Sequence, residues 1–166
     1  MSELKLRPVK PSEHDVAGGL VVEAYRSLGD EGDEFYEREL RDVSGRIRTA
    51  DVIVAEIDGR VVGCVTLSIG KTALSEVDDL GAATIRMLGV SSDVRGRGIG
   101  EALVRHCIEQ ARISGSKRVR LDTRTSMQSA QRLYERLGFR REPDDDWSPA
   151  PGNELLAYVL HLAETA

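Results

Sequence analysis

The chain has 166 residues, of which 40% are apolar and 31% charged, and its net charge at pH 7 is −5. This length suits one domain with a sizeable core, so we expect a single domain over residues 1–166. No apolar run is long enough for a membrane helix, the first residues lack a signal-peptide core, and the two cysteines and three histidines lack metal-ligand spacing. We therefore expect no metal, no membrane association, reduced cysteines and a cytoplasmic location.

Positive charge is concentrated in one part of this acidic chain. Residues 86–141 contain 13 Lys or Arg against 5 Asp or Glu. A basic segment in an acidic protein indicates one anionic partner bound at one place, and it argues against a surface for nucleic acid. The alternative is that these arginines only cover solvent-exposed helix faces.

The first half of the chain predicts a strand, two helices and a hairpin. The strand covers 4–9 and the helices cover 16–28 and about 34–48. Two β-rich runs then flank Asp58-Gly59, which is the strongest hairpin signal in the chain.

The second half predicts a strand–helix–strand unit followed by a helix and two strands. In the helix over 98–114, four apolar residues recur at four-residue spacing, and Gly115 is a natural stop. The order of predicted strands and helices along the whole chain indicates a mixed α/β fold. The remaining predicted elements are strands over 83–90 and 119–123, a helix over 127–137, and strands over 139–142 and 155–162.

Residues 94–100 read VRGRGIG and lie between a predicted strand and a predicted helix. The first N–H groups of a helix have no intrahelical partner, and the helix dipole favours negative charge there. Gly98 and Gly100 would let the backbone approach an anion closely because they lack a Cβ. Arg95 and Arg97 would supply positive charge. The stretch therefore predicts a site for a phosphate group.

Two common phosphate-binding patterns do not fit this stretch. A P-loop continues with Lys and Ser or Thr after its last glycine, whereas Glu101 and Ala102 follow Gly100. The dinucleotide fingerprint G-x-G-x-x-G fits at Gly96 and Gly98, but Glu101 stands where its third glycine belongs. These departures disfavour a nucleoside triphosphate site and a dinucleotide-dependent oxidoreductase.

Arg95, Gly98 and Gly100 do fit R-x-x-G-x-G, which resembles the acyl-CoA pyrophosphate loop of the GNAT superfamily of acyl-CoA-dependent N-acetyltransferases. A second stretch, SAQRLYERLGF over 129–139, is similar to the A-x-x-L-Y-x-x-x-G-F helix of that family. Its defined positions are filled by Ala130, Leu133, Tyr134, Gly138 and Phe139. Met127 stands where family members often carry Asn, so no hydrogen bond of that Asn is carried over to this chain.

The resemblance implies an α/β (α+β) fold: a single-domain GNAT fold with a mixed, mostly antiparallel twisted sheet of about seven strands, flanked by about four helices and splayed at its central strands. It implies acetyl-CoA as the acyl-donor cosubstrate. The backbone of Leu88, Gly89 and Val90 would meet the pantetheine arm, and Gly89 suggests a bulge there. The pyrophosphate would lie on the turn and the helix start, at Arg95, Gly96, Arg97, Gly98, Ile99 and Gly100.

The implied reaction is transfer of an acetyl group from acetyl-CoA to a primary amine of a small metabolite by direct attack. Tyr134 occupies the position at which many family members place a tyrosine near the CoA sulfur, so it is the candidate general acid. Its other interpretation is an aromatic residue on the packed face of a short helix. A protein or peptide N-acetyltransferase and a non-catalytic acyl-CoA-binding module are the alternative functions, and the resemblance also allows a homodimer.

The general base is left open by the sequence. Many relatives carry a Glu on the strand before the loop, but here that strand carries Arg86, which either faces solvent or pairs with a carboxylate in the acceptor pocket. A water chain without a dedicated base is equally acceptable. The candidate carboxylates are Glu76, Asp78 and Asp79 just upstream, and Asp122 on the next strand.

The acceptor site of the family is built from the first helices, the loop between them and the final hairpin. The acidic runs over 30–34 and 144–146 would attract a cationic amine there, or else they are solvated loops. Trp147 either walls the pocket or holds a long loop in place. The other aromatic residues of these segments are Tyr25, Phe35 and Tyr36.

Overall fold

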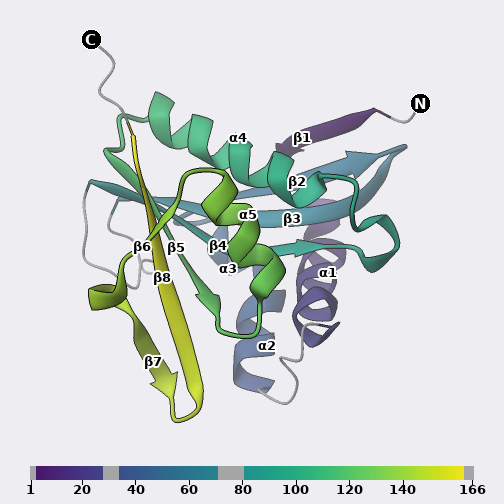
Figure 1. The fold of residues 1–166 in the computed structure, drawn as a ribbon. Helices are drawn as coiled ribbons and strands as arrows, with labels where there is room; N and C mark the ends of the chain where they lie inside the picture. Colours follow the sequence, from purple (N-terminus) through teal and green to yellow (C-terminus); the bar gives the residue numbers. More distant parts are fainter. Residues whose placement is uncertain (1–2, 28–33, 71–80, 163–166) are drawn as a thin grey trace.

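The computed structural model describes residues 3–27, 34–70 and 81–162 (Figure 1). Within them, eight strands form one sheet in the order β1-β2-β3-β4-β5-β8-β6, and β7 pairs with β8. Only β4 and β5 are parallel, and all other described pairs are antiparallel. The strands are β1 (Leu4–Pro8), β2 (Asp51–Ile57), β3 (Arg60–Ile69), β4 (Ala82–Val90), β5 (Arg118–Arg124), β6 (Arg140–Arg141), β7 (Trp147–Ala150) and β8 (Asn153–His161).

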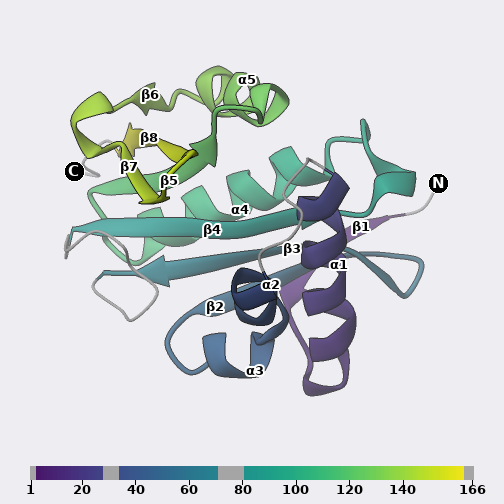
Figure 2. The same cartoon turned by 90° about the horizontal axis from the view of Figure 1, so that it is seen from below.

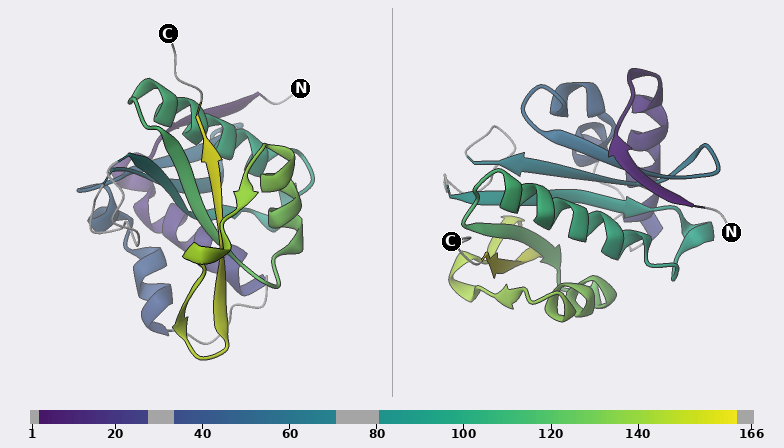
Figure 3. Two further views of the ribbon diagram at one scale, coloured as in Figure 1. Left: turned by 60° about the vertical axis from the view of Figure 1, so that its left-hand side comes forward. Right: turned by 90° about the horizontal axis from the view of Figure 1, so that it is seen from above.

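Helices cover both faces of the sheet (Figures 2 and 3). On one face, α4 and α5 pack against the sheet in a core that is continuous from β2 to β8. On the other face, α1, α2 and α3 enclose a second core against β2, β3 and β4. The described α-helices are α1 (His14–Ser27), α2 (Glu34–Arg41), α3 (Val43–Arg46), α4 (Ile99–Ile113) and α5 (Gln128–Arg136).

The two parallel strands separate at the middle of the sheet. Their ladder pairs Ala82–Ile85 with Arg118–Leu121 and then stops, although β4 continues to Val90 and β5 to Arg124. Beyond Ile85, the backbone groups of β4 that point toward β5 therefore have no ladder partner on that strand. The predicted mixed, mostly antiparallel sheet that is splayed at its centre is confirmed.

A β-bulge lies next to this separation. Thr66 pairs with Arg86 and Cys64 pairs with Gly89, so two residues of β4, Met87 and Leu88, oppose a single residue of β3. Met87 has φ of 56°, a left-handed conformation that a residue with a side chain seldom adopts. The bulge turns the second half of β4 away from the direction of its first half.

The bulge that Gly89 suggested in this strand is present, but it lies at Met87 and Leu88, because Gly89 itself is in register with Cys64. Gly89 serves a close approach instead: a Cβ here would lie 3.1 Å from the Cβ of Ala24 and 3.1 Å from the Cα of Val21. Both of these residues belong to α1. The glycine therefore lets α1 pack directly against β4. A close approach of another backbone is, besides a bulge, a common reason for a glycine within a strand.

The described residues form five α-helices where the sequence predicts about four, and eight strands where it predicts about seven. The helix predicted over 34–48 is divided at Asp42, whose side-chain oxygen accepts a hydrogen bond of 3.0 Å from the backbone N–H of Gly45 and so starts α3. The additional strand is β7, which contains Pro149 and follows an acidic run, so it lacks the β-rich composition of a strand.

The signals for the hairpin and for the central helix are confirmed. Asp58 and Gly59 both have positive φ, 52° and 78°, as a two-residue hairpin turn of type I′ requires. Gly115 ends α4 in the left-handed conformation with φ of 84°. The residues predicted to share one face of α4 are all buried: Ile99, Leu103, Cys107 and Ala111.

None of the helices in the described parts of the chain is both long enough and apolar enough to cross a membrane.

Adjacent glycines of α1 offer a matched test of this packing. A Cβ at Gly18 would lie 2.7 Å from the backbone oxygen of Arg41, at the end of α2, whereas a Cβ at Gly19 would meet only the tip of the Arg41 side chain at 3.8 Å. We expect Gly18→Ala to lower the free energy of unfolding by about 1–3 kcal/mol, because the two helices must move apart. Gly19→Ala is expected to raise it by up to about 1 kcal/mol through helix propensity. Urea denaturation of both variants measures the difference, and equal effects would contradict this contact.

Candidate functional site

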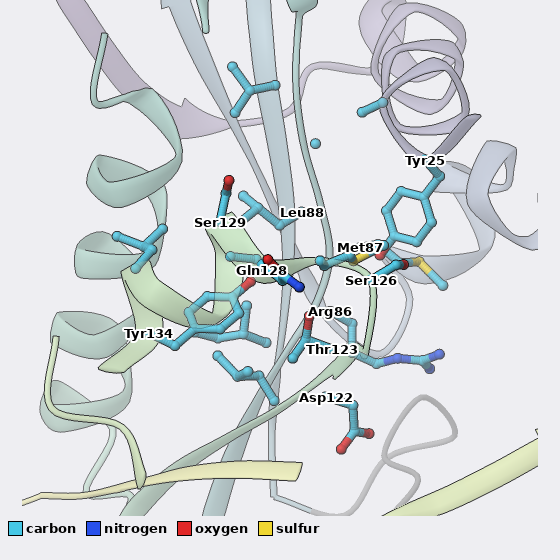
Figure 4. Close-up of a pocket in the computed structure, with 18 of the residues that line it drawn as sticks. Tyr25, Arg86, Met87, Leu88, Asp122, Thr123, Ser126, Gln128, Ser129 and Tyr134 are labelled. Carbon is cyan, nitrogen blue, oxygen red and sulfur yellow. The ribbon is translucent and has the colours of Figure 1, made fainter. Parts of the chain in front are cut away.

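A cleft of about 380 Å³ lies where β4 and β5 separate (Figure 4). The second half of β4, the end of β5, the end of α1, and α5 with the loop before it line the cleft. Apolar side chains make up most of its wall, with a few polar groups among them, as is typical of a small-molecule site. The break in the parallel ladder therefore opens this cleft.

The glycine-rich stretch forms the turn between β4 and α4. Gly96 and Gly98 both have φ of 78°, and a Cβ at either position would meet nothing within 4 Å. Gly98 is the N-cap of α4 and provides no side-chain cap. No side chain therefore caps the free N–H groups in the first turn of α4. These groups lie beside an open surface, and such a helix start is suited to binding an anion.

Glu101 lies in the first turn of α4 and would repel an anion there if it were unpaired. Its carboxylate instead forms ion pairs with Arg136 of α5 at 2.6 Å and with Arg105 at 3.4 Å. The hydrogen bond from Arg136 lowers the pKa of Glu101, followed by a smaller contribution from Arg105. These partners neutralise the acid and tie the start of α4 to α5.

The cofactor residues expected from the sequence fall into two groups. Leu88, Gly89, Val90 and Arg95 line the cleft. The others lie in the turn and at the start of α4, where Gly96, Arg97 and Gly98 are exposed. Gly100 is half-buried, and Ile99 is packed in the core with an exposure of 3%, so the Ile99 side chain does not contact a ligand at the turn.

Arg95 has a partner that sequence reasoning missed. Its Nη2 donates a hydrogen bond of 2.5 Å to Oγ of Ser27, and this hydroxyl in turn donates to the carbonyl oxygen of Ala24. Ser27 is the last residue of α1 and lies 68 positions earlier in the chain. No local motif marks it, since only the packing of α1 on β4 brings it to the turn.

Tyr134 lies on the packed face of α5 and also borders the cleft, so its role as the general acid stays a prediction. It lines the cleft from α5, and its ring also packs against Phe139 and Tyr158 with centroid distances of 5.8 and 6.2 Å. Its exposure is 6%, and burial raises its pKa to about 12. The phenol is therefore protonated at neutral pH.

Tyr25 approaches the cleft from α1, on the side opposite Tyr134 (Figure 4). Its ring lies 6.0 Å from that of Tyr36, centroid to centroid. Burial, and then the neighbouring Tyr36, raise the pKa of Tyr25 well above its usual value. Two of the aromatic residues expected near the acceptor are thus together. The side chain of Phe35 lies outside the described part of the structure.

Of the candidate bases, Asp122 lines the cleft, whereas Glu76, Asp78 and Asp79 lie outside the described residues. Asp122 Oδ2 accepts a hydrogen bond of 3.1 Å from Nε1 of Trp147. Arg86 also lines the cleft, which decides against the interpretation that this residue only faces bulk solvent.

The acidic run over 144–146 does not act as the free anionic patch that the sequence suggested. Asp145 pairs with Arg120 at 2.5 Å, and Asp146 pairs with Arg141 at 2.6 Å. The hydrogen bond from Arg141 lowers the pKa of Asp146. These arginines neutralise two of the three carboxylates, and the pairs fix the segment against the sheet. Most of the other acidic run, residues 30–33, lies outside the described residues.

Among the described residues, no group of three or more His, Cys, Asp or Glu side chains could hold a metal ion. Cys64 and Cys107 are free thiols and are buried, and burial raises their pKa values to about 11 and about 12. The thiols are therefore neutral and unreactive at physiological pH.

Comparison with known sequences finds a family and several relatives. The model of the acetyltransferase (GNAT) family matches residues 20–139. N-acetylaspartate synthetase of Danio rerio is 38% identical over 99 residues, which are 60% of this chain and 33% of that protein. N-acetyltransferase 8B of Homo sapiens is 38% identical over 113 residues, 66% of this chain and 48% of that protein. The chain thus matches between a third and a half of the length of these relatives.

Solved structures share the fold at low sequence identity. An acetyltransferase of the GNAT family from Staphylococcus aureus Mu50 superposes with a TM-score of 0.77 at 16% identity and covers 97% of this chain and 100% of its own. A GNAT family acetyltransferase from Elizabethkingia anophelis, solved with acetyl-CoA bound, gives a TM-score of 0.71 at 17% identity, with 96% and 98% covered.

The two left-handed glycines at the ends of α4 allow a matched test of the turn. Gly98 and Gly115 both have positive φ and open space around the missing Cβ, so alanine at either costs about 1–2 kcal/mol of stability. Only Gly98 lies at the uncapped N–H groups. We expect Gly98→Ala to weaken acetyl-CoA binding by about tenfold and Gly115→Ala to leave it unchanged. Calorimetric titration measures both affinities, and an unchanged affinity in Gly98→Ala would remove the turn from the site.

Proposed function

Because the chain belongs to the acetyltransferase (GNAT) family, we propose that it transfers an acetyl group from acetyl-CoA to a primary amine of a small molecule. One observation carries the proposal: the opening between β4 and β5 places a protonated tyrosine inside a cleft that leads to an uncapped, glycine-rich helix start. Such a cleft can hold a long cosubstrate with a reactive end inside and a charged end at the turn.

The pyrophosphate of acetyl-CoA would lie on the N–H groups of the turn and the first residues of α4, with Arg95 and Arg97 supplying positive charge. Ser27 holds the guanidinium of Arg95 at the edge of the cleft. The pantetheine arm would follow Leu88–Val90, where β4 no longer pairs with β5. In this arrangement the arm takes the place of the missing ladder partner.

Acetyl transfer then requires three steps from the residues of the cleft. The amine loses its proton, either to Asp122 or to a water chain, and its nitrogen attacks the thioester carbon. A backbone N–H of the Leu88–Val90 segment polarises the carbonyl oxygen and stabilises the tetrahedral oxyanion. As the C–S bond breaks, the Tyr134 hydroxyl donates its proton to the sulfur. The nitrogen, which became positively charged on attack, releases one proton to water as the amide forms, and water returns a proton to Tyr134.

One relative and the size of the cleft support a small-molecule acceptor. The N-acetylaspartate synthetase relative acts on a small molecule, as its name says. The described cleft is a partly enclosed, largely apolar cavity of about 380 Å³, a size that suits a small molecule. A small amine is therefore the proposed acceptor. A cytoplasmic location agrees with the two free cysteines, and a homodimer stays a prediction.

Ligand-dependent thermal stability tests the choice of cosubstrate. At about 100 times its dissociation constant a ligand adds about 2.7 kcal/mol to the free energy of unfolding. For a domain of this size we expect acetyl-CoA to raise the melting temperature by about 5–10 °C. NAD and ATP at the same concentration are expected to leave it unchanged, because the turn lacks both of their motifs. A shift with NAD and none with acetyl-CoA would contradict the proposal.

The role of Tyr134 is tested by removing its hydroxyl. We expect Tyr134→Phe to fold and to bind acetyl-CoA normally, and to lose about a hundredfold or more in kcat, because it removes only the proton donor. Tyr158→Phe is the matched control, since Tyr158 packs against the Tyr134 ring but does not line the cleft. Thiol release from acetyl-CoA measures turnover. A fully active Tyr134→Phe enzyme would exclude this residue as the acid.

A further inference from the structure

Two opposite charges face the cleft at the exact point where β4 and β5 separate. Ile85 and Leu121 form the last pair of the parallel ladder, so Arg86 and Asp122 are the first residue on each strand beyond it. Ile85 and Leu121 are packed in the core beneath α4. Because side chains alternate along a strand, Arg86 and Asp122 lie on the opposite face. Both line the cleft and both are labelled in Figure 4.

The carboxylate of Asp122 is held in place from outside the cleft. Trp147 donates its indole N–H to Asp122 Oδ2 at 3.1 Å. Trp147 begins β7, and the two residues before it are anchored by the ion pairs of Asp145 with Arg120 and of Asp146 with Arg141. A further bond from the backbone N–H of Ala157 to Asp146, 2.8 Å long, fixes this segment to β8. The whole segment therefore orients one carboxylate at the cleft.

We propose that the acceptor is an amino acid, or a compound that likewise carries a carboxylate close to its amine, and that Arg86 binds the carboxylate while Asp122 binds the ammonium group. This inference rests on the proposed acetyl transfer and specifies its acceptor. The last paired residues, Ile85 and Leu121, lie on strands about 4.8 Å apart. Arg86 and Asp122 directly follow this pair, so their side chains can contact the two ends of one small zwitterion.

The chemistry of both side chains suits this role. A guanidinium has five N–H donors in a rigid fork that matches a carboxylate, so it can hold a protein partner and a substrate together. A carboxylate has about four acceptor sites, so Asp122 can accept from the Trp147 N–H and from a substrate ammonium group at the same time. An amine without a carboxylate would lack the hydrogen bonds that the fork of Arg86 offers, and an acid without an amine would lack those of Asp122.

A comparison of acceptors that differ only in their carboxylate tests this inference independently of the proposed acetyl transfer. Thiol release from acetyl-CoA is measured with the full chain and a panel of standard amino acids, each beside its carboxamide and its decarboxylated amine. We expect at least one amino acid to exceed both of its partners in kcat/KM by about tenfold or more, as the loss of a charged hydrogen bond predicts. Turnover of the decarboxylated amines at rates equal to the amino acids would overturn the inference and leave the transferase proposal intact. No thiol release with any acceptor would overturn both.

Variants of Arg86 test whether this residue binds the carboxylate of the acceptor. Arg86→Gln is expected to raise the KM for the preferred amino acid by about tenfold or more while the KM for acetyl-CoA stays unchanged. Arg86→Lys keeps the charge without the fork and should restore part of the affinity. Arg112→Gln removes the same charge from the outer surface of α4, away from the cleft, and is the control. An Arg86→Gln enzyme that binds acetyl-CoA and keeps the wild-type KM for the amino acid would overturn the assignment.

Discussion

The interruption of the β4–β5 ladder is the constraint on which the rest of this molecule depends. Four pairs hold the two parallel strands together, and then the bulge at Met87 and Leu88 redirects β4 while β5 continues toward α5. Backbone groups in the middle of a sheet are ordinarily satisfied by the next strand. Here they border a cleft instead, and a ligand can take the position of the missing strand.

A hydrophobic core lies on each face of the sheet around this opening. One core runs from β2 to β8 beneath α4 and α5, and the other lies between β2, β3 and β4 and the helices α1, α2 and α3. Gly89 is central to this arrangement, because its missing Cβ lets α1 pack directly on the redirected half of β4. The same contact brings Ser27 to Arg95 and Tyr25 to the cleft. Packing of one helix therefore builds part of the wall and orients a charged group of the turn.

The arginines of the basic segment serve two purposes that the sequence alone did not separate. Arg112, Arg120, Arg136 and Arg141 pair with carboxylates, and they neutralise acids or fix loops. Arg95 and Arg97 lie at the turn before α4. Arg86 lines the cleft directly after the last β4–β5 pair. The alternative of arginines on exposed helix faces thus holds for Arg112 and Arg136, whereas the anionic partner at Arg95 and Arg97 stays a prediction.

The sequence by itself determined the features that depend on neighbours in the chain. The Asp58-Gly59 hairpin, the buried face of α4, its glycine stop and the glycine-rich turn all follow from local conformational preferences and periodicity. The tertiary structure decided what depends on distant residues: the end of the β4–β5 ladder, the bulge next to Gly89, the partner of Arg95, and the neutralisation of Asp145 and Asp146. Local preference limits the conformations of a few consecutive residues, whereas strand register and the pairing of charges are set by packing between segments far apart in the chain.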